Sequence, residues 1–269
     1  MRIYALQKRL HAWEPWWSIL RYVGVMAALF WLGGRGAANL GYNWQWYRVP
    51  QYIGTLKEGR IQMGPLLDGL LVTLKITGVS LVLALVFGLG TALLRLLPSM
   101  MGRFVARVYL EVIRNIPLLI LIFFVYFVIG PLFGWSRFFS AVLALSLFEG
   151  AYASEIFRAG IVSIHRGQWE AAYCLGLSSW DMYKTIILPQ ALRRILPPLT
   201  SQAVSLVKDS ALVSTIAVYD LTMRGQALVA ETFLAFELWF TVAGLYLLVT
   251  ITLSALAWAL ERKMAMDAA

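Results

Sequence analysis

The segment Glu170–Pro189, EAAYCLGLSSWDMYKTIILP, is a polar island between two long apolar runs. Its local signals predict two short helices joined by a sharp bend. We expect Glu170 in the first turn of the first helix, where a carboxylate favours the positive end of the helix dipole. Gly176 is suited to the left-handed cap that ends such a helix. The first helix is therefore expected to stop at Gly176.

The second half of the island carries the start signal of another helix. Ser178 precedes Asp181 by three residues, which is the spacing of a capping box, and Pro189 favours an end before it. The apolar contacts of this second helix are expected to be Trp180, Tyr183 and Ile187. These signals alone leave two interpretations open, a structural hairpin or a surface that docks a partner.

The composition of the whole chain places the island in a membrane protein. Of the 269 residues, 60% are hydrophobic and 14% are charged, and the mean hydropathy is +0.72, which leaves too little polar surface to coat a soluble globule. The net charge of +9 is scattered at the ends of apolar runs, so it does not form a basic stripe for nucleic acid. Only Cys174, His11 and His165 are present, which argues against disulfides and metal sites.

Six apolar runs approach the length of roughly 20 residues that crosses a bilayer. They cover residues 16–33, 66–94, 116–133, 138–159, 196–218 and 236–260. The run 196–218 is the weakest, because polar residues from Gln202 to Ser210 interrupt it. The sequence therefore predicts an all-α integral membrane protein with about six transmembrane helices.

Cationic residues indicate the orientation, since short cytoplasmic loops are rich in Lys and Arg. They gather in the N-terminal tail, in the loop after the second run, around the island and near the C-terminus. Six alternating helices would put all four segments on one side. We expect this side to be the cytoplasm, with both termini there. The loop between the first two runs, with Trp44, Trp46, Tyr47 and Tyr52, suits an amphipathic segment at the outer interface.

Small residues in two of the runs predict close packing of helices. Ala84 and Gly88 are four residues apart, and so are Gly150 and Ser154.

The island also resembles a known family. Its fixed positions match the EAA signature of ATP-binding-cassette (ABC) importer permeases; they are Glu170, Ala171, Ala172, Gly176, Ile186, Leu188 and Pro189. Other segments resemble the polar amino acid branch of that family; they are LLDGLLVTLKIT (66–77), EVIRNIPLL (111–119), FEGAYASEIFRAGI (148–161), LPQALR (188–193) and VKDSALVSTI (207–216).

This resemblance implies a MetI-like core of five helices with one additional N-terminal helix. Residues 65–262 would form the ABC transmembrane type-1 permease domain, with a cytoplasmic coupling loop at 160–195. Residues 1–64 would supply a cytoplasmic tail, the extra helix and an outer amphipathic loop, and 263–269 a C-terminal tail.

The resemblance further implies a permease subunit in the bacterial cytoplasmic membrane, and not an enzyme. In that family a separate ATPase dimer docks on the coupling loop, so Glu170, Ala171, Ala172 and Gly176 are the expected ATPase-contacting positions. No phosphate-binding Gly-x-x-x-x-Gly-Lys motif occurs, so no cofactor is expected in this chain, and ATP and Mg²⁺ would belong to the partner. The other expected partners are a second permease subunit, identical or paralogous, and an extracytoplasmic amino acid binding protein.

The segments quoted above resemble permeases for glutamate and aspartate most, with glutamine close behind. An excess of acidic groups in the pathway would instead favour basic amino acids. Two other classes remain as alternatives to the importer. A proton-coupled secondary transporter also has buried carboxylates but does not need the island. A membrane-embedded enzyme needs a nucleophile or a metal cluster, for which no set of residues is present.

Polar residues inside the runs are candidates for the substrate pathway, because ionisable groups at membrane depth are costly and functional. The candidates are Glu149, Tyr152, Glu155, Gln202, Ser205, Lys208, Asp209 and Ser210. Glu149, Tyr152 and Glu155 step by three and are expected to share one broad face. Each interpretation has an alternative: an intrahelical Glu155–Arg158 pair, interhelical hydrogen bonds of Gln202 and Ser205, or Asp209 and Ser210 capping a restarted helix.

Overall fold

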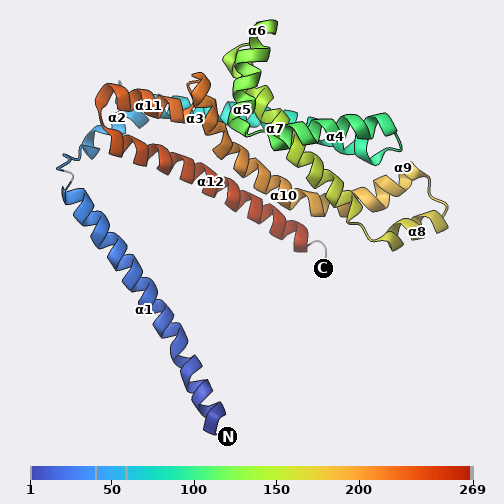
Figure 1. Cartoon of the computed structure of the whole chain (residues 1–269), viewed down its shortest axis with the longest axis horizontal. Coiled ribbons are helices and arrows are strands. Elements are labelled where there is room, and N and C mark those ends of the chain that lie inside the picture. Colours follow the sequence, from blue (N-terminus) through green and yellow to red (C-terminus); the bar gives the residue numbers. More distant parts are fainter. Residues whose placement is uncertain (1, 40, 58–59, 267–269) are drawn as a thin grey trace. The chain divides into compact units, whose positions relative to one another are not determined.

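The computed structural model describes residues 2–39, 41–57 and 60–266 (Figure 1). These residues belong to two compact units, Met1–Gln45 and Trp46–Ala269. The first unit contains the long helix α1 (Arg2–Asn39). The helix therefore extends over the expected N-terminal tail as well as over the apolar run 16–33. In this unit, Tyr42 and Trp44 form an edge-to-face aromatic pair.

In its described residues, the second unit is almost entirely helical, with one small hairpin of two strands. Its elements are η1 (Trp46–Arg48), α2 (Pro50–Ile53), β1 (Gly54–Lys57), β2 (Arg60–Met63), α3 (Pro65–Leu96), α4 (Met100–Asn115), α5 (Leu118–Phe123), η2 (Phe124–Ile129), α6 (Gly130–Phe133), α7 (Arg137–Val162), α8 (Arg166–Cys174), α9 (Ser179–Met182), η3 (Tyr183–Ile187), α10 (Leu188–Asp209), η4 (Ser210–Ile216), α11 (Leu221–Thr232) and α12 (Ala235–Met266). The strands pair antiparallel, with Gly54 opposite Met63. The predicted all-α class is thus confirmed, apart from this hairpin.

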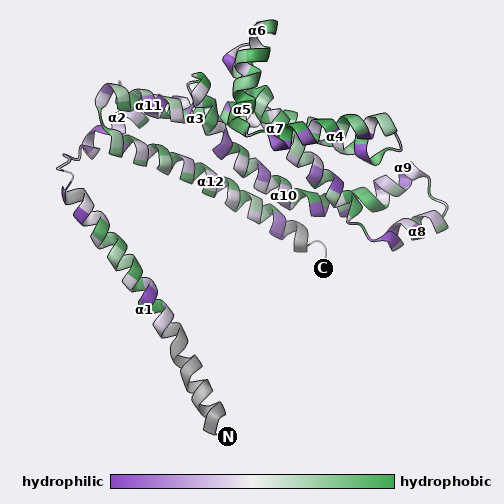
Figure 2. Ribbon diagram, in the orientation of Figure 1, coloured by the Kyte–Doolittle hydropathy of each residue, from purple (hydrophilic) through white to green (hydrophobic). Residues whose placement is uncertain are grey.

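Among the described residues, four helical segments are long and apolar enough to cross a membrane. They are Trp17–Gly36, Pro65–Leu96, Arg137–Val162 and Ala235–Arg262. A fifth span results if α4 and the segment Leu118–Phe133, which meet at a bend of 109°, count as one. Figure 2 shows hydrophobic residues along α5 and α6 of that bent pair. The expected run 196–218 falls in α10 and η4, which are not among these spans because their polar residues lower the hydropathy.

The segment expected as a cytoplasmic loop after α3 is helix α4. Ser99 caps its start by accepting a hydrogen bond from the Gly102 amide, at 3.1 Å. The helix ends at Asn115, and α5 begins after Pro117, since a proline disfavours the helical conformation of the residue before it. The arginines that were assigned to a loop therefore have fixed positions on a helix.

Close packing of α3 on α7 confirms the prediction from the small residues. A Cβ atom added to Gly88 would lie 2.7 Å from the Cβ atom of Ala153 and 3.0 Å from the Gly150 carbonyl oxygen. Ala84 and Ser154 are buried at the same crossing. The backbones of the two helices approach as closely as these residues permit.

A separate buried cluster attaches the segment α8–α9–η3 to the ends of α7 and α10. Ile161 of α7, Ala172 of α8, Met182 of α9 and Ile195 of α10 are among its buried members. At its base, the Ile195 side chain occupies the space that a Cβ atom on Gly160 would need. The island is therefore packed directly on α7 and α10, the two helices that it connects.

Candidate functional site

The polar island folds as two helical segments joined by a bend, as predicted. Gly176 has a φ of +70°, so it forms the left-handed cap after α8. The prediction for Glu170 is wrong, because α8 begins four residues earlier, where the His165 ring accepts a hydrogen bond from the Gly167 amide. Glu170 is consequently in the second turn, where its carboxylate pairs with Arg166 at 2.8 Å.

The second helix starts where the capping signal predicted but does not end before Pro189. The Ser178 hydroxyl accepts a hydrogen bond from the Asp181 amide, and the helix continues through α9 and η3 into α10. In the π-helical turn η3, the Leu188 amide donates to the carbonyl of Tyr183, five residues back. This wider turn lets the chain pass Pro189 without the clash and the lost bond that a proline causes in a regular α-helix.

Six exposed residues of the island form what we call the hairpin surface. Its apolar members are highly exposed: Tyr173 at 63%, Leu175 at 75% and Trp180 at 72%. Sequence reasoning overlooked the first two and wrongly expected Trp180 to pack inside; a signal was available in the large apolar side chains that follow the EAA motif. Its remaining members are Glu170, Ala171 and Gly176.

Ala172 does not belong to the hairpin surface. Its side chain is fully buried in the cluster that attaches α8 to the ends of α7 and α10. The structure therefore places Ala172 in the packing beneath the hairpin, and its contact with an ATPase stays a prediction. A small side chain is needed here for packing.

A second candidate site lies between α7 and α10. Glu149 is 1% exposed, and its carboxylate accepts a hydrogen bond from the Gln202 side-chain amide. The Asp209 carboxyl group is close enough to interact electrostatically with that of Glu149. The other oxygen of Glu149 is buried with no hydrogen-bond partner among the described residues. The alternative prediction for Gln202, a hydrogen bond between helices, is thereby confirmed. Its partner Glu149 is itself a candidate for the substrate pathway.

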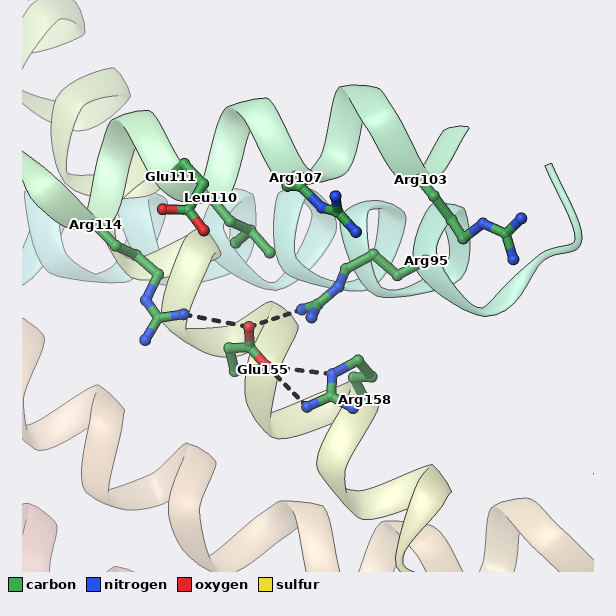
Figure 3. A pocket seen from close by; sticks show the side chains of 8 residues that line it. All are labelled: Arg95, Arg103, Arg107, Leu110, Glu111, Arg114, Glu155 and Arg158. Atoms are coloured by element: carbon green, nitrogen blue, oxygen red, sulfur yellow. Dashed lines mark hydrogen bonds and ion pairs between the residues drawn. The ribbon is translucent and has the colours of Figure 1, made fainter. Parts of the chain in front are cut away.

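Glu155 belongs to a different group of side chains (Figure 3). The expected pair with Arg158 is present at 3.2 Å, but Glu155 also pairs with Arg95 of α3 at 2.8 Å and Arg114 of α4 at 3.3 Å. The Tyr152 ring lies 5.9 Å from the Arg114 guanidinium, so it faces α4 as well. The expected common face of α7 is therefore divided between Glu149 and the arginine cluster.

The remaining candidates are on other faces of α10 and η4. Ser205 and Lys208 line a cavity of about 390 Å³ against α12, away from Glu149. The α-helix ends at Asp209, as a break there predicted, but the Asp209 side chain caps nothing. The Ser210 hydroxyl donates to the Val207 carbonyl at 2.7 Å. The predicted capping role of this pair is thus wrong, since Ser210 bonds the preceding helix.

Apolar spans, a buried polar group between the span α7 and helix α10, and an exposed hairpin with apolar side chains are the features of a membrane protein with a surface suited to a partner. Residues 84–266 match the family described as "Binding-protein-dependent transport system inner membrane component". The chain belongs to this family of inner membrane components. It is therefore a permease subunit and not an enzyme. Its relatives are not secondary transporters.

Two relatives show how far the similarity extends. The glutamine transport system permease protein GlnP of Escherichia coli (strain K12) is 40% identical over 202 residues, which cover 74% of this chain and 92% of the relative. The arginine transport system permease protein ArtQ of Bacillus subtilis (strain 168) is 36% identical over 201 residues, with the same coverage.

Solved structures show the same fold. A crystal structure of an amino acid ABC transporter with histidines has a TM-score of 0.70 and 35% identity, and the match covers 74% of this chain and 94% of that one. The inward-facing MetNI methionine transporter has a TM-score of 0.65 at 20% identity, which confirms the expected MetI-like fold. Membership of this family implies an ATPase and a binding protein as partners in general.

Proposed function

We propose that this chain is the membrane-spanning subunit of an ABC importer for glutamine, driven by a separate ATPase that docks on the hairpin surface. The observation that carries the docking role is the exposure of Tyr173, Leu175 and Trp180 on a polar hairpin. Exposed apolar side chains grouped in this way mark a protein interface. ATP and Mg²⁺ are bound by the ATPase.

The buried cluster beneath the hairpin supports a mechanism for coupling. Ala172 and Met182 pack with Ile161 of α7 and Ile195 of α10, so a displacement of the hairpin moves both helices. The same two helices carry Glu149 and Gln202. A rotation imposed by the docked ATPase therefore changes the distance between the groups of the candidate pathway.

The docking role is tested by Leu175→Asp and Gly176→Asp. The first removes apolar surface, and the second forces a bulky residue into a left-handed conformation, at a cost of about 1–2 kcal/mol. We expect both variants to insert normally, to lose the ATPase during purification and to lose ATP-driven uptake. Lys184→Asp, a charge change elsewhere on the hairpin, is the matched control and should retain the ATPase. Retention of the ATPase by all three variants would disprove the docking role.

The electrostatics of the α7–α10 site favour a neutral or cationic substrate. Glu149 and Asp209 place two carboxyl groups together, and Lys208 points to a different cavity. A glutamate or aspartate side chain would meet like charge there, so we favour glutamine over the acidic amino acids. The two acidic groups also support a second candidate, arginine, which is in the name of one relative.

Uptake by the reconstituted complex tests this assignment. Labelled glutamine should be taken up, and an excess of unlabelled glutamate should compete poorly. In Glu149→Gln, which keeps a side chain able to bond Gln202, the substrate concentration that half-maximally stimulates ATP hydrolysis should shift. Glu111→Gln, an exposed carboxamide substitution on α4, is the control. An unchanged concentration dependence in Glu149→Gln would remove Glu149 from the pathway.

The assembly that we propose has a second permease subunit, identical or paralogous, and an extracytoplasmic binding protein that delivers the substrate. Both termini and the hairpin surface face the cytoplasm. This orientation follows from the excess of Lys and Arg in the segments on that side.

A further inference from the structure

A strongly basic cavity lies where the end of α3, helix α4 and the end of α7 meet (Figure 3). Its volume is about 270 Å³. Seven of the residues that line it are charged: Arg95, Arg103, Arg107, Arg114, Arg158, Glu111 and Glu155. Five cations and two carboxylates give the cavity a formal charge of +3. Neither candidate site of the importer includes this cavity, since Glu149 faces α10.

The positive charge of the cavity is only partly neutralised from within. Glu155 is shared by the guanidinium groups of Arg95, Arg114 and Arg158. The Glu111 side chain accepts a hydrogen bond from Asn115, at 3.2 Å. Within the described part of the chain, Arg103 and Arg107 have no ion pair or hydrogen bond, and both are exposed. Two guanidinium groups, one helical turn apart, are therefore available to an anion.

An apolar surface runs along the same helix beside these arginines. Met100, Phe104, Val108 and Val112 of α4 are between 46% and 84% exposed. At 100° per residue these four positions fall on one side of the helix, and Arg103 and Arg107 border it. A ligand that follows α4 thus meets an apolar strip and a cationic edge in parallel.

The position in the bundle agrees with an interfacial ligand. Glu155 and Arg158 are in the last two turns of α7, and α8 begins four residues after α7 ends. The cavity is therefore at the end of the membrane spans from which the segment α8–α9 extends. In the proposed orientation this end meets the cytoplasmic leaflet, which carries the anionic lipids.

We propose that this cavity binds the phosphate group of an anionic phospholipid, whose acyl chains lie along the exposed apolar strip of α4. The paired donors of a guanidinium group match phosphate oxygens in a bidentate manner, which makes arginine well suited to this role. Basic pockets between membrane helices on the cytoplasmic side are a recognised way to hold such head groups. A cavity near the lower limit of about 300 Å³ for ligand pockets holds a head group and not a larger molecule.

Native mass spectrometry of the complete chain, titrated with phosphatidylglycerol and with phosphatidylcholine, tests the proposal. We expect selective retention of phosphatidylglycerol. Arg103→Gln/Arg107→Gln should weaken this binding about 25-fold, the product of roughly 5-fold for each cation removed. Lys184→Gln/Arg193→Gln, which removes two exposed cations outside the cavity, should bind as the wild type does. Arg103→Lys/Arg107→Lys should retain most of the affinity.

Two outcomes would overturn the proposal. Equal loss of phosphatidylglycerol in both Gln double variants would mean that net charge, and not this cavity, attracts the lipid. Protection of the wild type against heat by inorganic phosphate, without retention of any lipid, would assign the cavity to a free anion. The two Gln double variants change no buried or paired side chain, so both should fold. A single monodisperse peak in gel filtration verifies this.

Discussion

At the scale of single residues, Asp220 shows how one buried carboxyl group connects two helices, α11 and α12, beside a contact with a third. It caps α11 by accepting a hydrogen bond from the Met223 amide at 2.9 Å. Its other oxygen accepts from the Tyr246 hydroxyl of α12, at 3.3 Å. The adjacent Leu221 amide donates to the Thr73 hydroxyl of α3, at 3.1 Å. Asp220 itself lies outside the apolar spans, between η4 and α11, and its contribution to stability should respond to pH.

Burial raises the pKa of Asp220 from 3.8 to about 6. Between these values the folded protein binds more protons than the unfolded chain, so the free energy of unfolding falls as pH rises from about 4 to about 6. Asp220→Asn keeps an N-cap residue and cannot ionise, so this part of the pH dependence should disappear. Thermal unfolding in detergent across that range is the measurement. Asp68→Asn, at an exposed position, is the control, and parallel profiles for Asp220→Asn and wild type would contradict the expectation.

Among the carboxylates that are exposed or half-buried, Glu155 is the one whose replacement should lower the free energy of unfolding most. In Glu155→Gln three arginines lose their common counter-ion and repel one another. Fully buried pairs cost about 3–5 kcal/mol when one partner is removed, and because this side chain is partly exposed we expect roughly 1–3 kcal/mol. The fall in melting temperature should be largely reversed when Arg95→Gln is added. No recovery in the double variant would mean that charge repulsion is not the cause.

At the scale of elements, the local sequence signals were sufficient to predict helix ends that depend only on neighbouring residues. Gly176 ends α8 and Ser178 starts α9 as predicted, since both act on neighbouring amides. The start of α8 was not predictable, because His165 is an unusual cap. The continuation of the helix past Pro189 was not predictable either, because the π-helical turn has no simple sequence pattern. The pairing of Glu155 with Arg95 joins residues 60 apart, which no local spacing reveals.

The crossing of α3 and α7 offers a matched pair of substitutions. Gly88→Ala places a methyl group 2.7 Å from Ala153, so overpacking should cost about 1–3 kcal/mol. Gly90→Ala, two residues along the same helix, has nothing within 4 Å and should be neutral or slightly stabilising. The melting temperature should therefore fall in Gly88→Ala and stay the same or rise in Gly90→Ala. Equal changes would show that this crossing tolerates separation.

At the scale of the whole molecule, the chain has a family part and an additional part. The family match begins at residue 84, and α1 lies outside it. The domain boundaries predicted from the sequence, 1–64, 65–262 and 263–269, stay a prediction. The structure carries α12 to Met266, and residues 267–269 lie outside the part that it describes. The composition was sufficient to predict an integral membrane protein. The sequence of α1 carries no signal for its role beyond its hydropathy.

Cys174 is the only cysteine in the sequence and is exposed on α8, so it reports the orientation directly. A membrane-impermeant maleimide should label it in inside-out vesicles and leave it unlabelled in intact cells. In Cys174→Ser/Tyr219→Cys the pattern should be reversed, because Tyr219 is exposed and follows the end of α10 that is opposite to the hairpin. Labelling of Cys174 from outside intact cells would invert the proposed topology.

The contact of Ile195 with Gly160 has a mechanical consequence. A branched side chain seated against a bare backbone allows two helices to tilt about the point of contact but resists sliding along it. Glu149 lies eleven residues, or about 16 Å, from Gly160 along α7, and the hairpin lies on the other side. In the proposed coupling mechanism we expect this contact to act as a pivot, so that a movement of the hairpin tilts the part of α7 that carries Glu149 in the opposite direction.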